Sequence, residues 1–116
     1  PILQKGNEYF DIKNAKYDLS IKQEEYQLAI KEVEKKIKQA FTKYKTANRI
    51  FQQTYKIYNL QEQKLKRTEE SSAIGAVGKI DLLNSKISHD EARVKLYESE
   101  MAALKAYYEL MLLIEG

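Results

Sequence analysis

The residues that could do chemistry are few, and the best-placed pair follows two glycines. Asp81 and Asn84 stand three residues apart just after Gly78. On a helix that begins there, this spacing puts both side chains on one face. A carboxylate near a helix N-terminus is stabilised by the helix dipole by about 0.3–1 kcal/mol. A structural role therefore explains Asp81 as well as a functional one does.

Metal and nucleophile chemistry find little support in the sequence. The chain has no cysteine and one histidine, His89, which has no second metal-ligating partner nearby and is expected to be an exposed helix side chain. The sequence shows no nucleophile–base pair, no glycine-rich phosphate loop and no metal triad. We therefore expect no cofactor and no enzymatic activity.

Composition indicates long helices. Of 116 residues, 43% are apolar and 32% charged, with only four Gly and one Pro. The net charge of +3 is too dispersed for a nucleic-acid-binding stripe, so we expect no DNA or RNA partner. No stretch reaches the roughly 18–20 apolar residues of a membrane-spanning helix. The chain opens at Pro-Ile-Leu without a leader, so we expect a piece of a longer protein.

The first element is a long helix over residues 7–74, because neither Gly nor Pro occurs between Gly6 and Gly75. Its apolar positions recur about every 3.56 residues, close to the heptad value, which predicts helices packed nearly parallel. The series is Tyr26, Ala29, Val33, Ile37, Ala40, Tyr44, Ala47, Phe51, Tyr55 and Tyr58.

A reversal at residues 75–79 and a returning helix over 80–115 follow, with Gly116 as the end signal. The apolar series of the returning helix is Ile80, Leu83, Ile87, Val94, Tyr97, Met101, Leu104, Tyr108 and Met111. The predicted fold class is all-α, a long antiparallel helical hairpin of coiled-coil type.

The two predicted helices differ in length. Folding back at 75–79 sets Ile114 beside residue 39, so about the first 30 residues of the long helix lack a partner in this chain. The end of the returning helix is apolar on nearly every side, which predicts burial by more than one neighbour. The alternative is a self-contained coiled-coil or spectrin-like interaction module, a three-helix bundle with a turn near residues 38–45.

Three local patterns together resemble the TolC family of outer-membrane efflux and secretion channels. Residues 1–6, Pro-Ile-Leu-Gln-Lys-Gly, resemble the end of a barrel strand where the chain enters its long periplasmic helix. Residues 75–84, Gly-Ala-Val-Gly-Lys-Ile-Asp-Leu-Leu-Asn, resemble the periplasmic tip. Residues 112–116, Leu-Leu-Ile-Glu-Gly, resemble the close of the returning helix.

The resemblance implies the second-repeat hairpin of an α-helical periplasmic tunnel. The parent would be a homotrimer in the outer membrane of a Gram-negative-type bacterium, with this segment in the periplasm. It would serve drug efflux or type I secretion with a periplasmic adaptor (membrane fusion protein) and, indirectly, an inner-membrane pump. A third reading, a segment of a helical pore-forming toxin, would need a longer apolar stretch near the tip than Ile80 to Leu83 supplies.

The resemblance also assigns site residues. Asp81 and Asn84 would form the pore gate, where a threefold axis gathers an acidic ring that favours cations. Some relatives carry a second Asp at the position of Asn84, so a ring with Asn84 would have half the charge of theirs. The adaptor-binding tip would be Ser71, Ser72, Gly75, Ala76, Val77, Gly78 and Lys79.

Overall fold

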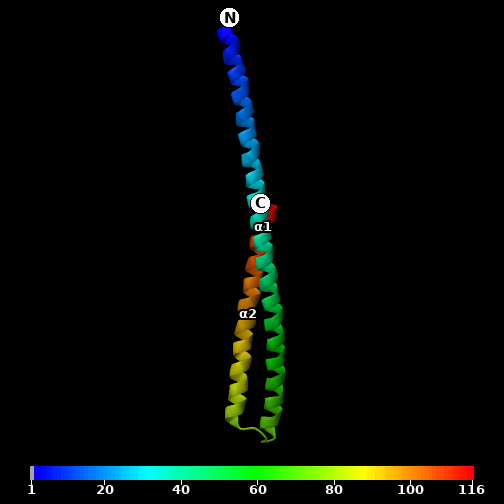
Figure 1. Cartoon of the computed structure of the whole chain (residues 1–116). Coiled ribbons are helices and arrows are strands. Elements are labelled where there is room, and N and C mark those ends of the chain that lie inside the picture. The colour runs from blue at the N-terminus through cyan, green and yellow to red at the C-terminus, as the bar shows by residue number, and fades with distance from the viewer. Residues whose placement is uncertain (1) are drawn as a thin grey trace. The chain divides into compact units, whose positions relative to one another are not determined.

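Two long α-helices make up the part of the chain that the structure describes. The computed structural model describes residues 2–116, and side chains from Gln4 onward. Helix α1 spans Ile2–Ala73 and helix α2 spans Lys79–Glu115 (Figure 1). The predicted all-α class is confirmed, because no strand occurs within residues 2–116.

The start of α1 differs from the predicted strand-to-helix entry. Residues 2–6 already belong to the helix, while Pro1 lies outside the described residues. A strand is stable only when neighbouring strands take up its backbone hydrogen bonds, and residues 2–116 supply none. A glycine such as Gly6 costs a helix only about 1 kcal/mol, so local hydrogen bonding extends α1 through it.

The three-helix alternative is not formed. Helix α1 continues through residues 38–45, where that bundle needs a turn. No Gly, Pro or Asn-Gly interrupts this stretch, so every backbone group there has its helical partner four residues away. The prediction of an uninterrupted first helix is the correct one.

The chain divides into two compact units, Pro1–Lys38 and Gln39–Gly116. The first consists of the beginning of α1 alone. From Gln4 to Lys38 every residue is exposed except Gly6 and Ile37, which are half-buried. Large apolar side chains are among the exposed ones, including Tyr26 and Leu28. This unit therefore has no core of its own.

The second unit, Gln39–Gly116, is an antiparallel hairpin in which the rest of α1 runs beside α2 (Figure 1). Its register is marked at one end by Lys43 Nζ, 3.1 Å from Glu109 Oε2. Near the reversal, Ser85 Oγ lies 3.1 Å from Thr68 Oγ1. The contact of residue 43 with residue 109 agrees with the predicted alignment of residue 39 with Ile114 to within about one residue.

The helices meet along a heptad contact line, here called the hairpin seam. On α1 its half-buried residues follow steps of three and four: Ala40, Tyr44, Ala47, Phe51, Thr54, Tyr58, Gln61, Leu65, Thr68 and Ser72. On α2 the buried and half-buried residues are Leu82, Ser85, His89, Ala92, Leu96, Ser99, Ala103, Ala106 and Leu110. Alternate steps on α2 are Ser or Ala, and such small residues let two helices approach closely.

The apolar series predicted for α2 is not the one that packs against α1. Its members from Ile80 to Tyr108 are exposed, for example Tyr97 at 59% and Met101 at 64%. We call the whole predicted series, Ile80 to Met111, the outer stripe of α2. Two heptad lines run along this helix, and the more apolar of them is the outer stripe. Small side chains at the contact allow closer packing than bulky ones, so the less apolar line faces α1.

Candidate functional site at the hairpin tip

The reversal begins with a regular helix termination built on a glycine. The backbone N–H of Ala76 donates to the carbonyl of Ser71 at 2.8 Å, and that of Gly75 donates to Ser72 at 3.1 Å. This pair of bonds is a Schellman motif, whose central residue needs a positive φ. Gly75 has φ of +75°, which a side chain would disfavour. Gly75 therefore supplies the backbone conformation on which this helix end depends.

The second glycine starts α2 in a different way. Gly78 is the N-cap residue with φ −75° and ψ 165°, an extended conformation open to any residue. Gly78 has no side chain that could cap the helix with a hydrogen bond. The backbone amides of the first turn are instead stabilised by a nearby negative charge. Asp81 is the acidic residue of that turn, where the helix dipole favours a carboxylate.

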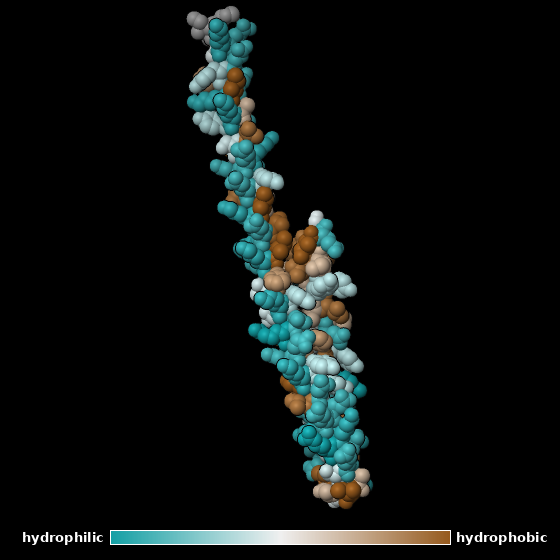
Figure 2. Space-filling model, turned by 90° about the vertical axis from the view of Figure 1, so that its right-hand side faces the viewer, coloured by the Kyte–Doolittle hydropathy of each residue, from teal (hydrophilic) through white to brown (hydrophobic). Residues whose placement is uncertain are grey.

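The predicted tip residues come together around this turn. Ser71 and Ser72 lie half-buried in the last turn of α1, and Val77 is half-buried within the loop. The others, Gly75, Ala76, Gly78 and Lys79, are exposed. Beside them Ile74 is 82% exposed, and apolar side chains are visible at this end of the molecule in Figure 2. The tip is thus a small, accessible surface with apolar character.

The predicted gate residues lie on the first turns of α2. Asp81 and Asn84 are both exposed and stand one helical turn apart. Neither points into the hairpin seam, which passes through Leu82 and Ser85 instead. One chain offers a single carboxylate here, so an acidic ring requires further copies.

The seam next to the tip is polar, a feature that the prediction missed. Ser85, which is buried, donates to Thr68 Oγ1, and Thr68 in turn donates to the carbonyl of Lys64 at 2.8 Å. One turn further, Gln61 Oε1 is buried and has no hydrogen-bond partner. Burying a polar atom without a partner costs about 1–3 kcal/mol.

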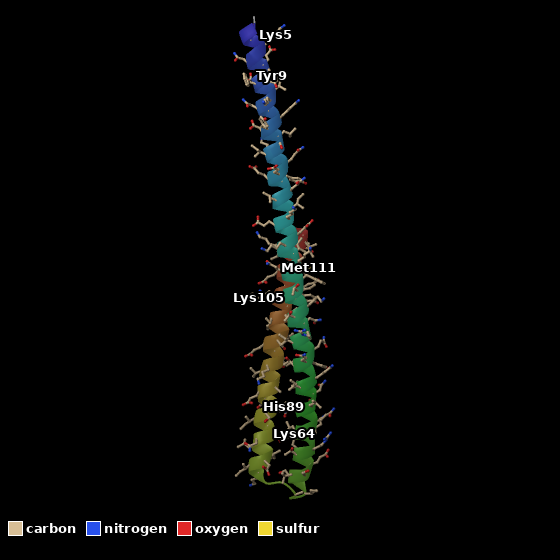
Figure 3. The ribbon with its side chains drawn as sticks, viewed as in Figure 1. Lys5, Tyr9, Lys64, His89, Lys105 and Met111 are labelled. Atoms are coloured by element: carbon tan, nitrogen blue, oxygen red, sulfur yellow. The ribbon has the colours of Figure 1, made fainter. Side chains whose placement is uncertain are left out.

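His89 belongs to this polar part of the seam and is not the exposed histidine that was predicted. Its side chain is only 13% exposed, and its ring lies 5.3 Å from that of Tyr58 on α1. Figure 3 marks its place in the half of α2 nearer the tip. Gln61, Ser85 and His89 follow the heptad spacing of the seam, but polar side chains at such positions do not predict burial from sequence alone.

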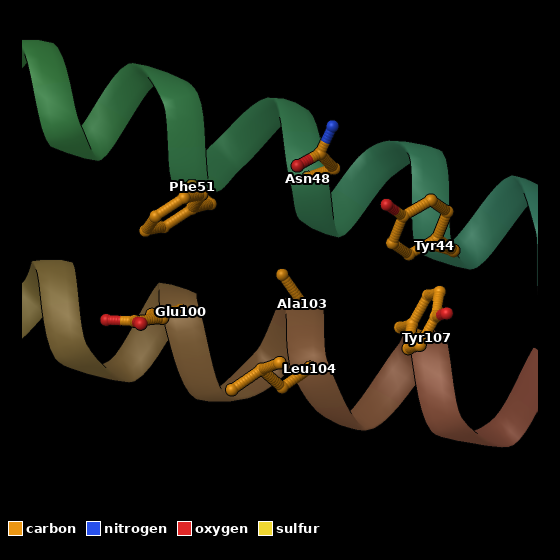
Figure 4. A pocket seen from close by; sticks show the side chains of 7 residues that line it. All are labelled: Tyr44, Asn48, Phe51, Glu100, Ala103, Leu104 and Tyr107. Carbon is orange, nitrogen blue, oxygen red and sulfur yellow. The ribbon is translucent and has the colours of Figure 1, made fainter.

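The other half of the seam is richer in apolar and aromatic side chains, although half-buried Thr54 and buried Ser99 also lie in it. Leu96 and Leu110 are 9% and 5% exposed, and the rings of Tyr44 and Tyr107 lie 5.8 Å apart. A shallow groove of about 340 Å³ runs along it between Tyr44, Phe51 and the opposing α2 residues (Figure 4). The hairpin is therefore held most firmly away from the tip, and its tip half costs less to separate.

Two further findings bear on the chemistry of the chain. Within residues 2–116, no cluster of three or more His, Cys, Asp or Glu side chains could hold a metal ion. Over the same residues, neither helix has an apolar stretch sufficient to cross a membrane.

Comparison with family models, curated proteins and solved structures gave no match.

Proposed function

We propose that this chain is a helical hairpin of a TolC-like outer-membrane channel, the segment that forms part of the periplasmic tunnel and carries its tip. The parent protein is a homotrimer for drug efflux or type I secretion. Its tip docks a periplasmic adaptor, which links it to an inner-membrane pump. The role is mechanical and conductive, without covalent catalysis.

One observation carries the proposal. The hairpin reverses at Gly75 to Gly78, and Asp81 follows in the first turn of α2. These are the residues that resemble the family's periplasmic tip, so the motif and the reversal coincide.

The distribution of polar residues in the seam supports a tip that opens. Thr68, Ser85 and Gln61 contribute less burial of apolar surface than Leu96 and Leu110 do further away. Separation of α1 from α2 near the tip then costs little while the rest stays packed. Such a gradient suits a pore entrance that widens when a partner docks.

The gate is tested by ion conduction through the protein that carries this hairpin, reconstituted in planar bilayers. We expect cation-selective channels, and Asp81→Asn should lower cation selectivity because the ring loses its charge. Glu115→Gln is the matched control, since Glu115 is an exposed carboxylate of the same helix at the end away from the tip. Absence of channels, or equal effects of both variants, would contradict the gate.

Adaptor docking is tested separately by cross-linking. Val77→Cys in the loop should join to a cysteine placed in the hairpin tip of the periplasmic adaptor. Lys56→Cys, exposed on α1 away from the tip, is the control and should not react. Equal cross-linking at both positions would remove the tip from the docking site.

A further inference from the structure

The outer stripe of α2 has the spacing of a second helix–helix contact. From Ile80 to Met111 its positions advance by three and four residues in turn, with Asp90 filling the one polar step. At about 100° per residue, the centre of this stripe lies about 160° around the helix from the hairpin seam. Helix α1 therefore cannot cover it. Soluble proteins seldom leave so long an apolar line bare.

We propose that the outer stripe binds α2 of a second copy of this chain, with the two helices parallel and in register. In a parallel pair the residues flanking the stripe meet across the interface, each g position against the e position five residues further along the partner. The three such charged pairs are Lys86 with Glu91, Arg93 with Glu98, and Glu100 with Lys105. Every pair joins opposite charges, and twofold symmetry doubles each one.

The opposite orientation is poorer. The antiparallel alignment that covers the whole stripe sets residue 80 against residue 111. In this alignment Glu91 of each copy faces Glu98 of the other, which gives two repulsive pairs. The only attractive charged pairs are those between Arg93 of one copy and Glu100 of the other. Flanking charges fix the orientation of coiled-coil helices, so this pattern selects the parallel pair.

A hollow on this face matches the packing expected of such a pair. A surface groove of about 430 Å³ is lined by Ile87, Asp90, Glu91 and Val94, together with Lys95 and Glu98. The first four are the residues that surround a hole for one incoming side chain in a coiled coil.

Asp90 itself sets the register. Arg93 Nη2 lies 3.2 Å from Asp90 Oδ1, so its charge is partly neutralised at the stripe. A single polar residue in a coiled-coil core lowers stability but penalises shifted alignments. In register, the two Asp90 carboxylates meet each other, each with its own arginine. In a shifted alignment they would face apolar side chains.

The inference goes beyond the channel proposal and does not depend on it. The twofold contact is not the contact between neighbours around the threefold axis of the proposed channel, so the two proposals concern different interfaces. Self-association through α2 and docking at the tip use different residues. Either can fail while the other holds.

Orientation is tested by single-cysteine variants, which are clean because the chain has no cysteine. Under mild oxidation, Ile87→Cys and Leu104→Cys should each form a disulfide-linked dimer alone. Antiparallel pairing would instead join the two variants only when mixed, and that result would overturn the proposal. Gln53→Cys, exposed on α1, is the control and should stay monomeric.

Charge exchange is the second test, read by sedimentation velocity. Lys86→Glu with Arg93→Glu should raise the dissociation constant by about tenfold or more, because four attractive pairs become repulsive and Asp90 loses its ion pair with Arg93. Glu91→Lys with Glu98→Lys should do the same. An equimolar mixture of the two variants should associate again as a heteromer, since every pair is then attractive.

A control variant changes the net charge by the same amount as the charge-exchange variants but at residues outside α2. Lys56→Glu with Lys66→Glu alters exposed residues of α1 and should leave the dissociation constant within about twofold. If the unmodified chain remains monomeric at high concentration, or if the mixture does not recover, the parallel α2 contact is refuted.

Discussion

Replacing Ala106 by leucine tests whether the hairpin is built on small residues of α2. Ala106 is only 2% exposed, the lowest value among the core residues. Leucine adds three carbon atoms where two helices already touch, and overpacking of this kind costs about 1–3 kcal/mol. The two residues differ little in helix propensity, so the effect reports packing. Because a two-helix hairpin can part locally, we expect about 1–2 kcal/mol.

Ala102→Leu provides the matched control, with the same substitution one turn earlier at an exposed position. It should leave the free energy of unfolding within about 0.5 kcal/mol. Both variants are followed by urea denaturation with circular dichroism, at several protein concentrations to separate folding from self-association. If Ala106→Leu is as stable as the parent chain, the assignment of Ala106 to the hairpin seam is wrong.

Three further predictions concern the turn and the polar seam. Gly75→Ala should lower the free energy of unfolding by about 1 kcal/mol, because residue 75 has a positive φ. Gly78→Ala should be nearly neutral, because residue 78 is extended, and urea denaturation of both variants measures the difference. Gln61→Leu should stabilise the hairpin by about 1 kcal/mol, because it removes a buried oxygen that has no hydrogen-bond partner. Backbone hydrogen exchange near the tip should become slower, and faster exchange would contradict this account of Gln61. Lys43→Ala should lower the free energy of unfolding by less than about 0.5 kcal/mol, because the ion pair of Lys43 with Glu109 is exposed. Thermal denaturation measures the change, and a larger loss of stability would show that the pair is shielded from water.

The tip shows how far local sequence can specify a site. The first helix was predicted to end before Gly75 because that is the first Gly or Pro after Gly6, and in the structure Gly75 has the positive φ of a helix-ending glycine. Asp81 was predicted in the first turn of the next helix and lies there. Such features depend on a few neighbouring residues. Whether Asp81 faces other copies depends on contacts that lie outside one chain.

The sequence by itself determined the helical class, the absence of a turn near residue 40 and the position of the reversal. These follow from backbone propensities and from where glycines stand. Only the tertiary structure decided which line of α2 faces α1. Two heptad lines share that helix, and close approach through Ser85, Ala92 and Ala106 prevailed over the more apolar outer stripe. Packing of two surfaces depends on shape as well as hydrophobicity, and shape appears only when both helices are in place.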